Sequence, residues 1–279
     1  MRMRRNASAA LAAAVSLFVI ETPVLADGPR SAAPIQSNWS GFYLGAYAGR
    51  AWADADLRTD TGAITATSYF VSPANTASIN ENGSGSVSAD AAVGGVQIGF
   101  NVQQGKLVAG LEVDFGAFDL NGSRGVANFP YPATPPSTYT TRASMDTDWL
   151  FTARARLGWA LQPNLLIYAT GGLALTNLRV SNSFSDDSDT AGVGGASRTQ
   201  VMTGWTLGGG AEFVLSRGWS VKAEYLYVDI GSTTVRSSVV CGPTATFDCS
   251  APPPVTPSPF TTSSDLSAHI ARVGLNYKF

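Results

Sequence analysis

Apolar and polar residues alternate strictly in eight segments of the chain. This two-residue period is that of a β-strand whose two faces meet different surroundings. The predicted strands cover residues 42–51, 96–103, 107–116, 149–159, 165–175, 205–213, 221–227 and 271–279. Residues 165–175 are apolar on both faces, so the register of this fifth strand stays open.

The connections between these segments alternate in length. Three are tight turns, at residues 103–106, 160–164 and 215–218, whereas four are long, at roughly 53–90, 119–146, 176–202 and 230–266. Short turns at one end and long loops at the other are typical of outer-membrane barrels, and loops this long are unusual in a compact soluble domain. We therefore predict an all-β fold: an eight-stranded antiparallel up-and-down transmembrane barrel with four long extracellular loops.

The distribution of residues on the two faces favours a membrane barrel over a soluble one. Glycines and charges share one face, as a narrow lumen that mixes large and small side chains requires. The six tryptophans fall at or just beyond strand ends, where interface aromatics sit in membrane barrels. They are Trp39, Trp52, Trp149, Trp159, Trp205 and Trp219. A sheet in lipid must close, because open edges would leave backbone groups unpaired.

The first residues have the three parts of a secretory signal. Three arginines precede an apolar run over residues 7–20. Val24, Leu25 and Ala26 then supply the small or modest residues that a signal peptidase recognises. The run is too short to span a bilayer comfortably. We expect a signal peptide over residues 1–26 and a periplasmic N-terminal segment over 27–38. The outer-membrane barrel would then cover residues 39–279.

The charge of the chain limits its partners. Cleavage after Ala26 leaves 15 basic and 19 acidic side chains, so nucleic acid is not an expected partner. Cys241 and Cys249 lie close together in a proline-rich segment, and in an exported protein they predict a local disulfide. His269 is the single histidine, so no histidine-based metal cluster is possible. We expect no metal and no other cofactor.

Charged side chains on the inward face form the main candidate site. Charges in a narrow lumen are costly unless they are paired. One interpretation is an ion-pair network that plugs the barrel; the other is a gated channel in which pairs such as Glu224 and Arg272 exchange partners. The predicted lumen network comprises Glu112, Asp114, Arg154, Arg156, Glu212, Lys222, Glu224, Arg272 and Lys278.

Several strand motifs resemble a known family. They are WSGFYLG from Trp39, GLEVD from Gly110, RARLG from Arg154, WSVKAEYLYVD from Trp219 and the terminal VGLNYKF. These resemble the small OmpA-like outer-membrane barrels, the opacity-like and haemin-binding group known as a porin family. The resemblance covers nearly all strands and fails in the long loops. It implies an assembly signal read by the outer-membrane assembly machinery, formed by Val273, Leu275, Tyr277 and Phe279.

The expected location is therefore the outer membrane of a Gram-negative bacterium, in contact with lipid and lipopolysaccharide. We expect a monomer with a structural and surface-presenting role and no catalytic residues. The alternatives are a narrow or gated diffusion channel for small solutes and surface binding of haemin or another ligand by the loops, with haemin docking on loop aromatics such as Tyr69, Phe70 and Tyr139. His269 lies on the lipid-facing side without a suitably placed acidic partner, so we do not expect it to act as a catalytic base.

Overall fold

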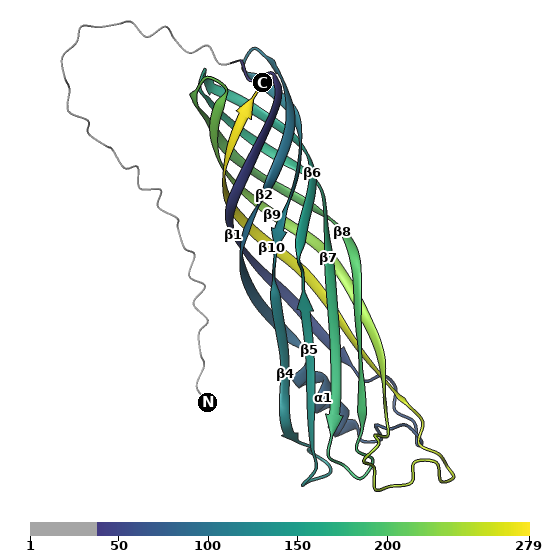
Figure 1. Ribbon diagram of the computed structural model, residues 1–279. Helices are drawn as coiled ribbons and strands as arrows, with labels where there is room; N and C mark the ends of the chain where they lie inside the picture. Colours follow the sequence, from purple (N-terminus) through teal and green to yellow (C-terminus); the bar gives the residue numbers. More distant parts are fainter. Residues whose placement is uncertain (1–37) are drawn as a thin grey trace, which may run out of the picture. The chain divides into compact units, whose positions relative to one another are not determined.

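The computed structural model describes residues 38–279, which form one continuous sheet and a short helix (Figure 1). The predicted signal peptide and nearly all of the N-terminal segment lie outside these residues. The elements are β1 (Gly41–Asp60), α1 (Pro73–Gly83), β2 (Gly85–Gln104), β3 (Leu107–Phe118), β4 (Asn121–Pro130), β5 (Thr138–Asp146), β6 (Trp149–Gln162), β7 (Leu165–Asp186), β8 (Val193–Ser216), β9 (Trp219–Val240) and β10 (Ser258–Lys278). Within residues 38–279, no helix is long and apolar enough to cross a membrane.

Eight of the strands close into an antiparallel barrel. Their order is β1-β2-β3-β6-β7-β8-β9-β10, and β10 pairs back onto β1 from Tyr43↔Lys278 to Asp60↔Thr261. Glycines with positive φ, Gly105 at +62° and Gly218 at +79°, allow two of the tight turns. These turns and the C-terminus define what we call the turn end; α1 and the long connections lie at the loop end (Figure 1). The eight-stranded prediction is confirmed.

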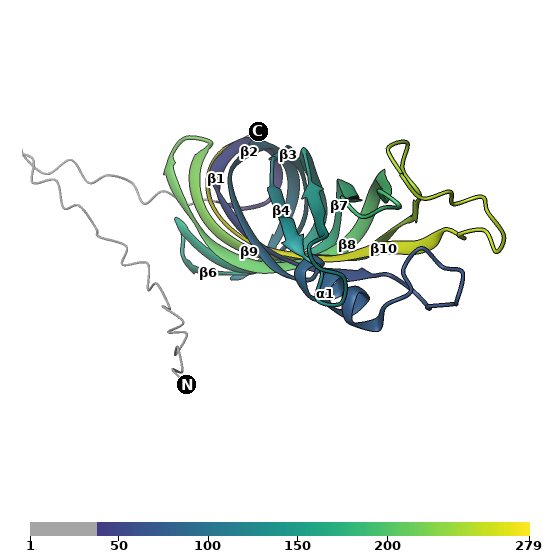
Figure 2. The ribbon, with the colours of Figure 1, turned by 90° about the horizontal axis from the view of Figure 1, so that it is seen from below.

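The predicted long loops are largely strand, which corrects the expectation. β7 and β8 have 22 and 24 residues, about twice the 9 to 11 that a tilted crossing requires. The segment 119–146 holds the hairpin β4–β5, which pairs with residues 179–186 of β7, the part of that strand nearer the loop end. The remaining connections at the loop end are residues 61–84 with α1, 131–137, 187–192 and 241–257. Figure 2 shows α1 beside β4 when the barrel is viewed from the loop end.

The two faces exchange character along each strand. On β10 near the turn end, Val273 and Leu275 face outward while Arg272 and Asn276 are buried inside. Closer to the loop end of β10, Leu266 and Ile270 point inward. We call the barrel up to the level of Arg50 on β1 and His269 on β10 the turn half, and the rest the loop half. The turn half is apolar outside and polar inside, as a bilayer demands, and the loop half has the faces of a water-soluble protein.

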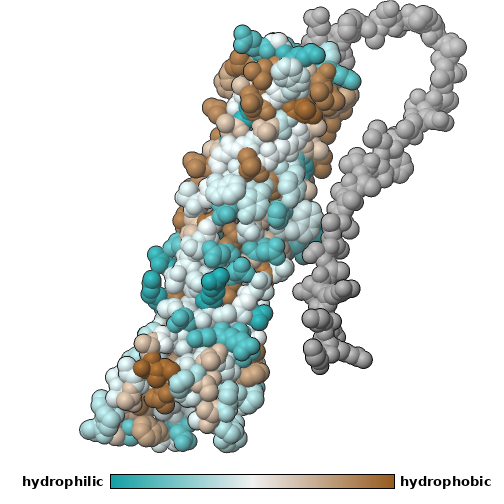
Figure 3. Space-filling model, turned by 180° about the vertical axis from the view of Figure 1, so that it is seen from behind, coloured by the Kyte–Doolittle hydropathy of each residue, from teal (hydrophilic) through white to brown (hydrophobic). Residues whose placement is uncertain are grey.

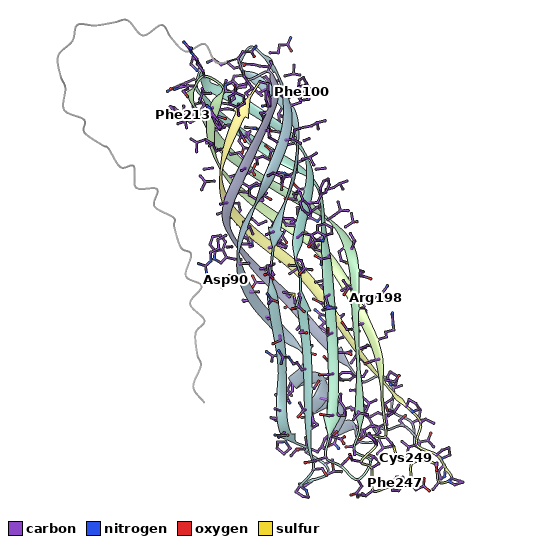
Figure 4. The ribbon with its side chains drawn as sticks, viewed as in Figure 1. Asp90, Phe100, Arg198, Phe213, Phe247 and Cys249 are labelled. Carbon is purple, nitrogen blue, oxygen red and sulfur yellow. A yellow bond between two sulfur atoms is a disulfide. The ribbon has the colours of Figure 1, made fainter. Side chains whose placement is uncertain are left out.

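The exposed surface follows the same division. Leu111 is 67% exposed and Phe42 61% exposed, both in the turn half. Figure 3 shows hydrophobic side chains gathered towards the turn end and hydrophilic ones over the middle of that face. Figure 4 places Phe100 and Phe213 near the turn end, Asp90 and Arg198 between the ends, and Phe247 and Cys249 at the loop end. The outward apolar face predicted for the short strands is confirmed by these exposures.

In the loop half the described strands separate into two sections of the sheet. Residues 195–204 of β8 have no backbone pairing with β9, and residues 85–92 of β2 have none with β3 or β4. The strands therefore form two four-stranded sections of the sheet, β2-β1-β10-β9 and β4-β5-β7-β8, which pair again at the loop end through Val193↔Val240 and Gly194↔Val239. An apolar cluster fills the space between them, with Ala53, Ile230 and Leu266 from the first section and Met145, Leu178 and Val180 from the second. This arrangement has the packing of a β-sandwich.

The register of the fifth predicted strand is now fixed. On β7, Leu166, Tyr168 and Thr170 are buried inside, whereas Ile167 and Leu173 face outward. Apolar side chains on both faces of the segment explain why alternation alone left the choice open.

Candidate functional site

Eight of the nine predicted lumen charges converge inside the turn half. They come from β3, β6, β8, β9 and β10, and each is at most 5% exposed. We call this set the lumen charge network: Glu112, Asp114, Arg154, Arg156, Glu212, Lys222, Glu224 and Arg272. Four carboxylates face four cations, so the buried charge balances without help from solvent.

Arg154 lies at the centre of the network. Its guanidinium contacts Glu112 at 2.5 Å and Asp114 at 2.7 Å, and Glu224 lies 3.1 Å from the same group. β6 places Arg154 directly beside Glu112, its register partner on β3. The contact with Glu224 comes from β9, so the side chain reaches beyond its neighbouring strand across the lumen.

Arg272 and Lys222 complete this cluster from the opposite wall. Arg272 contacts Glu224, its register partner on β9, at 2.6 Å and Asp114 at 3.1 Å. The structure thus pairs Glu224 with Arg272, as their places on adjacent strands suggested. The ammonium of Lys222 lies 2.8 Å from Glu112. Arg154, Lys222 and Arg272 each lie within 4.0 Å of more than one carboxylate. Loss of one carboxylate therefore leaves each cation with another partner.

A second cluster lies nearer the turn end. Arg156 forms an ion pair with Glu212, and the guanidinium stacks over the ring of Tyr168 at 3.7 Å. Glu212 also accepts hydrogen bonds from Ser220 at 2.5 Å and Asn276 at 2.9 Å. The carboxylate is therefore saturated by protein groups.

Several neutral residues of the site were missed by the charge-based prediction. The Tyr43 hydroxyl donates to Glu112 at 2.7 Å, and Tyr47 donates to Asp114 at 3.3 Å. Thr152 donates to Asp114 at 2.6 Å. All three lie on the inward face of their strands, so alternation carried the signal that would have found them.

Lys278 is wrongly included in the predicted network. It is half-buried at the rim of the turn end, where its ammonium donates to the backbone carbonyl of Asn38. No carboxylate of residues 38–279 lies within ion-pair distance of it. The reason is its position: as the last residue of β10 it lies beyond the level of the buried pairs.

Trp39 is also placed differently from the prediction. It is 5% exposed and packs inside the barrel against Val108, Leu166 and Tyr168. Two residues before β1, it continues the inward face of Tyr43. The other five tryptophans point outward; Trp52, Trp159, Trp205 and Trp219 are 42–49% exposed and Trp149 is half-buried beside Phe115.

The remaining candidates have local partners. The Nδ1 atom of His269 lies 2.6 Å from the Tyr225 hydroxyl on the outer surface. Phe70 and Tyr139 are buried in an aromatic cluster at the loop end, and the Tyr69 hydroxyl donates to Asp186 at 2.8 Å. Burial raises the pKa of Tyr69 to about 12. Phe70 and Tyr139 therefore pack against the chain itself, whereas Tyr69 is half-buried; binding of haemin stays a hypothesis.

The cysteine prediction is confirmed. Cys241 and Cys249 form a disulfide, eight residues apart in the connection between β9 and β10. The proline-rich stretch that follows, residues 251–254, is exposed.

The terminal strand presents its predicted assembly signal outward. Val273 is 57% exposed and Phe279 is 77% exposed, with Leu275 and Tyr277 between them on the same face. The lipid-facing orientation agrees with the alternation; recognition by the assembly machinery stays a prediction.

Known proteins with similar sequences are outer-membrane proteins. The chain is 30% identical to a 31 kDa outer-membrane immunogenic protein of Brucella melitensis over 98% of each chain. A 22 kDa outer membrane protein of Rhizobium leguminosarum is 30% identical over half of this chain and 53% of its own. The crystal structure of the outer membrane protein OprG from Pseudomonas aeruginosa matches 88% of this chain and 99% of its own, at 12% identity and a TM-score of 0.47.

The model of the outer membrane protein beta-barrel domain matches residues 9–279. This match spans the closed sheet, the outward apolar face of the turn half and the buried charges within it. The chain therefore belongs to the outer membrane protein beta-barrel domain family and is an integral protein of the Gram-negative outer membrane.

Proposed function

We propose that this protein is a closed, non-conducting barrel that supports the envelope and presents its loop end at the cell surface, without catalytic turnover. The observation that carries the proposal is the lumen charge network, whose eight charged side chains are all nine-tenths or more buried. Because Arg154 and Arg272 each contact carboxylates from two other strands, the network spans the lumen as a plug.

A second barrier supports the same proposal. The apolar cluster of the loop half fills the space beyond the network with side chains such as Phe118, Leu178 and Leu226, each fully buried. An ion entering from the loop end would have to cross this apolar layer before it met the charges, and transfer of a charge into such a layer is strongly unfavourable.

The loop end supports the surface-presenting part of the proposal. Residues 251–254 are exposed, and the disulfide between Cys241 and Cys249 restrains the segment that precedes them. In the proposed orientation, the turn end faces the periplasm and this tip faces outward, as is usual for outer-membrane barrels.

The proposal is tested in cells that lack the protein. We expect greater sensitivity to sodium dodecyl sulfate, restored by the wild-type chain and also by a variant lacking residues 251–254, because the barrel remains intact. The loop variant should lose surface labelling by an antibody raised against residues 249–257. Unchanged detergent sensitivity in the deletion strain would refute the structural role.

A further inference from the structure

A cavity of about 370 Å³ lies inside the turn end of the barrel. Apolar surfaces come from Trp39, Tyr43 and Val214, and polar groups come from Asn101, Arg217 and Lys278. Glu212, a member of the lumen charge network, also lines the cavity. The volume falls within the range of pockets that hold small molecules.

Two buried polar groups in the lining have no hydrogen-bond partner among residues 38–279. Asn101 is 3% exposed, and its Oδ1 atom is unpaired. Trp39 is 5% exposed, and its indole Nε1–H is unpaired as well. Since buried polar groups are nearly always hydrogen-bonded, these two point to a bound molecule with polar atoms of its own.

The rim of the cavity carries unbalanced positive charge. No carboxylate of the described chain lies within 4.0 Å of the charged group of Arg217 or Lys278. Glu212, the acidic residue of the lining, is already paired with Arg156 and hydrogen-bonded to Ser220 and Asn276. An incoming anion would therefore meet two cations and no unpaired acidic side chain of the lining.

We propose that this cavity binds a small amphipathic carboxylate. The carboxylate lies at the rim beside Arg217 and Lys278, and an aromatic body packs between Trp39, Tyr43 and Val214. An N–H group on that body donates to the unpaired Oδ1 atom of Asn101. The proposal does not depend on whether the lumen is sealed, because the residues at the rim of the cavity belong to the turn end.

Indole-3-acetate is a suitable probe, titrated calorimetrically into the refolded mature protein in a neutral maltoside detergent. We expect saturable binding at one site. Arg217→Ala and Lys278→Ala should each weaken binding about tenfold, the loss expected for one charge-assisted hydrogen bond. Arg58→Ala removes the same charge from the outer surface of the loop half and should leave binding unchanged.

Two further comparisons make the test decisive. Val214→Trp fills the cavity and should abolish binding. If the tryptophan prevents this variant from folding, Asn101→Leu replaces it in the test and should weaken binding. A gel-mobility assay identifies the folded variants. Indole-3-acetamide, a neutral analogue, should bind at least tenfold more weakly.

The proposal is overturned if the acid and the amide bind equally, or if a folded Val214→Trp variant binds as the wild type does. A phospholipid headgroup offers a similar anion, so dihexanoyl phosphatidylglycerol is titrated in parallel. Binding of this lipid through Arg217 and Lys278, without binding of indole-3-acetate, would assign the rim to lipid and also overturn the proposal.

Discussion

Arg272 on β10 holds Asp114 on β3 across the lumen through two hydrogen bonds of 3.1 Å each. β1 and β2 separate these strands in the sheet, so the pair crosses the interior instead of following a strand ladder. The contact ties two distant walls of the barrel together, and both side chains are buried.

Asp114→Ala should destabilise the barrel strongly. The substitution leaves Arg154 and Arg272 with fewer carboxylate partners in a buried setting, for which about 3–5 kcal/mol is the expected loss of unfolding free energy. Urea unfolding of the refolded protein in detergent measures it. Asp54→Ala, on the outer surface of β1, is the matched control and should cost less than about 0.5 kcal/mol. Equal effects of the two substitutions would contradict the network's role.

Gly172→Ala should disturb the contact between β6 and β7. A Cβ atom at Gly172 would lie 2.1 Å from the Ala153 carbonyl oxygen and 2.7 Å from the Arg154 Cα atom, so the strands must shift. We expect a loss of about 1–3 kcal/mol, seen as a lower temperature at which the folded gel band disappears. At Gly94 the nearest such contact is 3.4 Å, so Gly94→Ala should change little. If both variants lose the folded gel band at the same temperature, the close approach at Gly172 does not limit the stability of the barrel.

Tyr69 should ionise later than an ordinary tyrosine. Burial raises its pKa from an ordinary value of about 10 to about 12. A raised folded-state pKa contributes stability that is complete below pH 10 and is lost as the pH rises towards 12. Tyrosinate absorbance at pH 11 should therefore be nearly the same in the wild type and in Tyr69→Phe. A drop by one full tyrosine equivalent in the variant would show that Tyr69 ionises normally.

Reduction of the disulfide should leave the barrel folded. Cys241 and Cys249 both lie in the connection after β9, so the bond closes a loop that contains no barrel strand. We expect unchanged mobility of the unheated protein on a gel and faster proteolysis within residues 241–257. Loss of the folded band on reduction would place the disulfide among the determinants of the barrel itself.

The turn half could be predicted from sequence because a bilayer imposes strict alternation. On β1, outward Phe42 and Leu44 alternate with inward Tyr43 and Gly45, and the structure keeps this order. The loop half was missed although it also alternates, as in Ala53, Asp54, Ala55 and Asp56. Small alanines and a polar outer face give a weaker hydrophobic contrast, and the length of a bilayer crossing argued for ending the strand early.

Within the site, the alternation of inward and outward positions along each strand was sufficient to find the buried charges. It did not set their depth along the lumen. Lys278 shares the inward face of Arg272, yet it lies at the rim because nothing in a two-residue period reports distance from a barrel end. Trp39 shows that nearness to a strand end does not decide which way a side chain points. It lies near a strand end, as an interface aromatic would, but its parity directs the ring into the barrel. Cross-lumen partners such as Arg154 and Glu224 depend on the closed tertiary arrangement, which strand periodicity does not encode.

Single-channel conductance of the refolded mature chain in planar bilayers tests the sealed barrel most directly. Folding is first verified by the faster mobility of the unheated protein on a gel, and Arg272→Ala serves as the comparison. We predict a silent bilayer for the folded wild-type protein, because the lumen charge network and the apolar cluster both block the path. Discrete conductance steps in the wild type, changed in size by Arg272→Ala, would contradict the account and show that the lumen conducts.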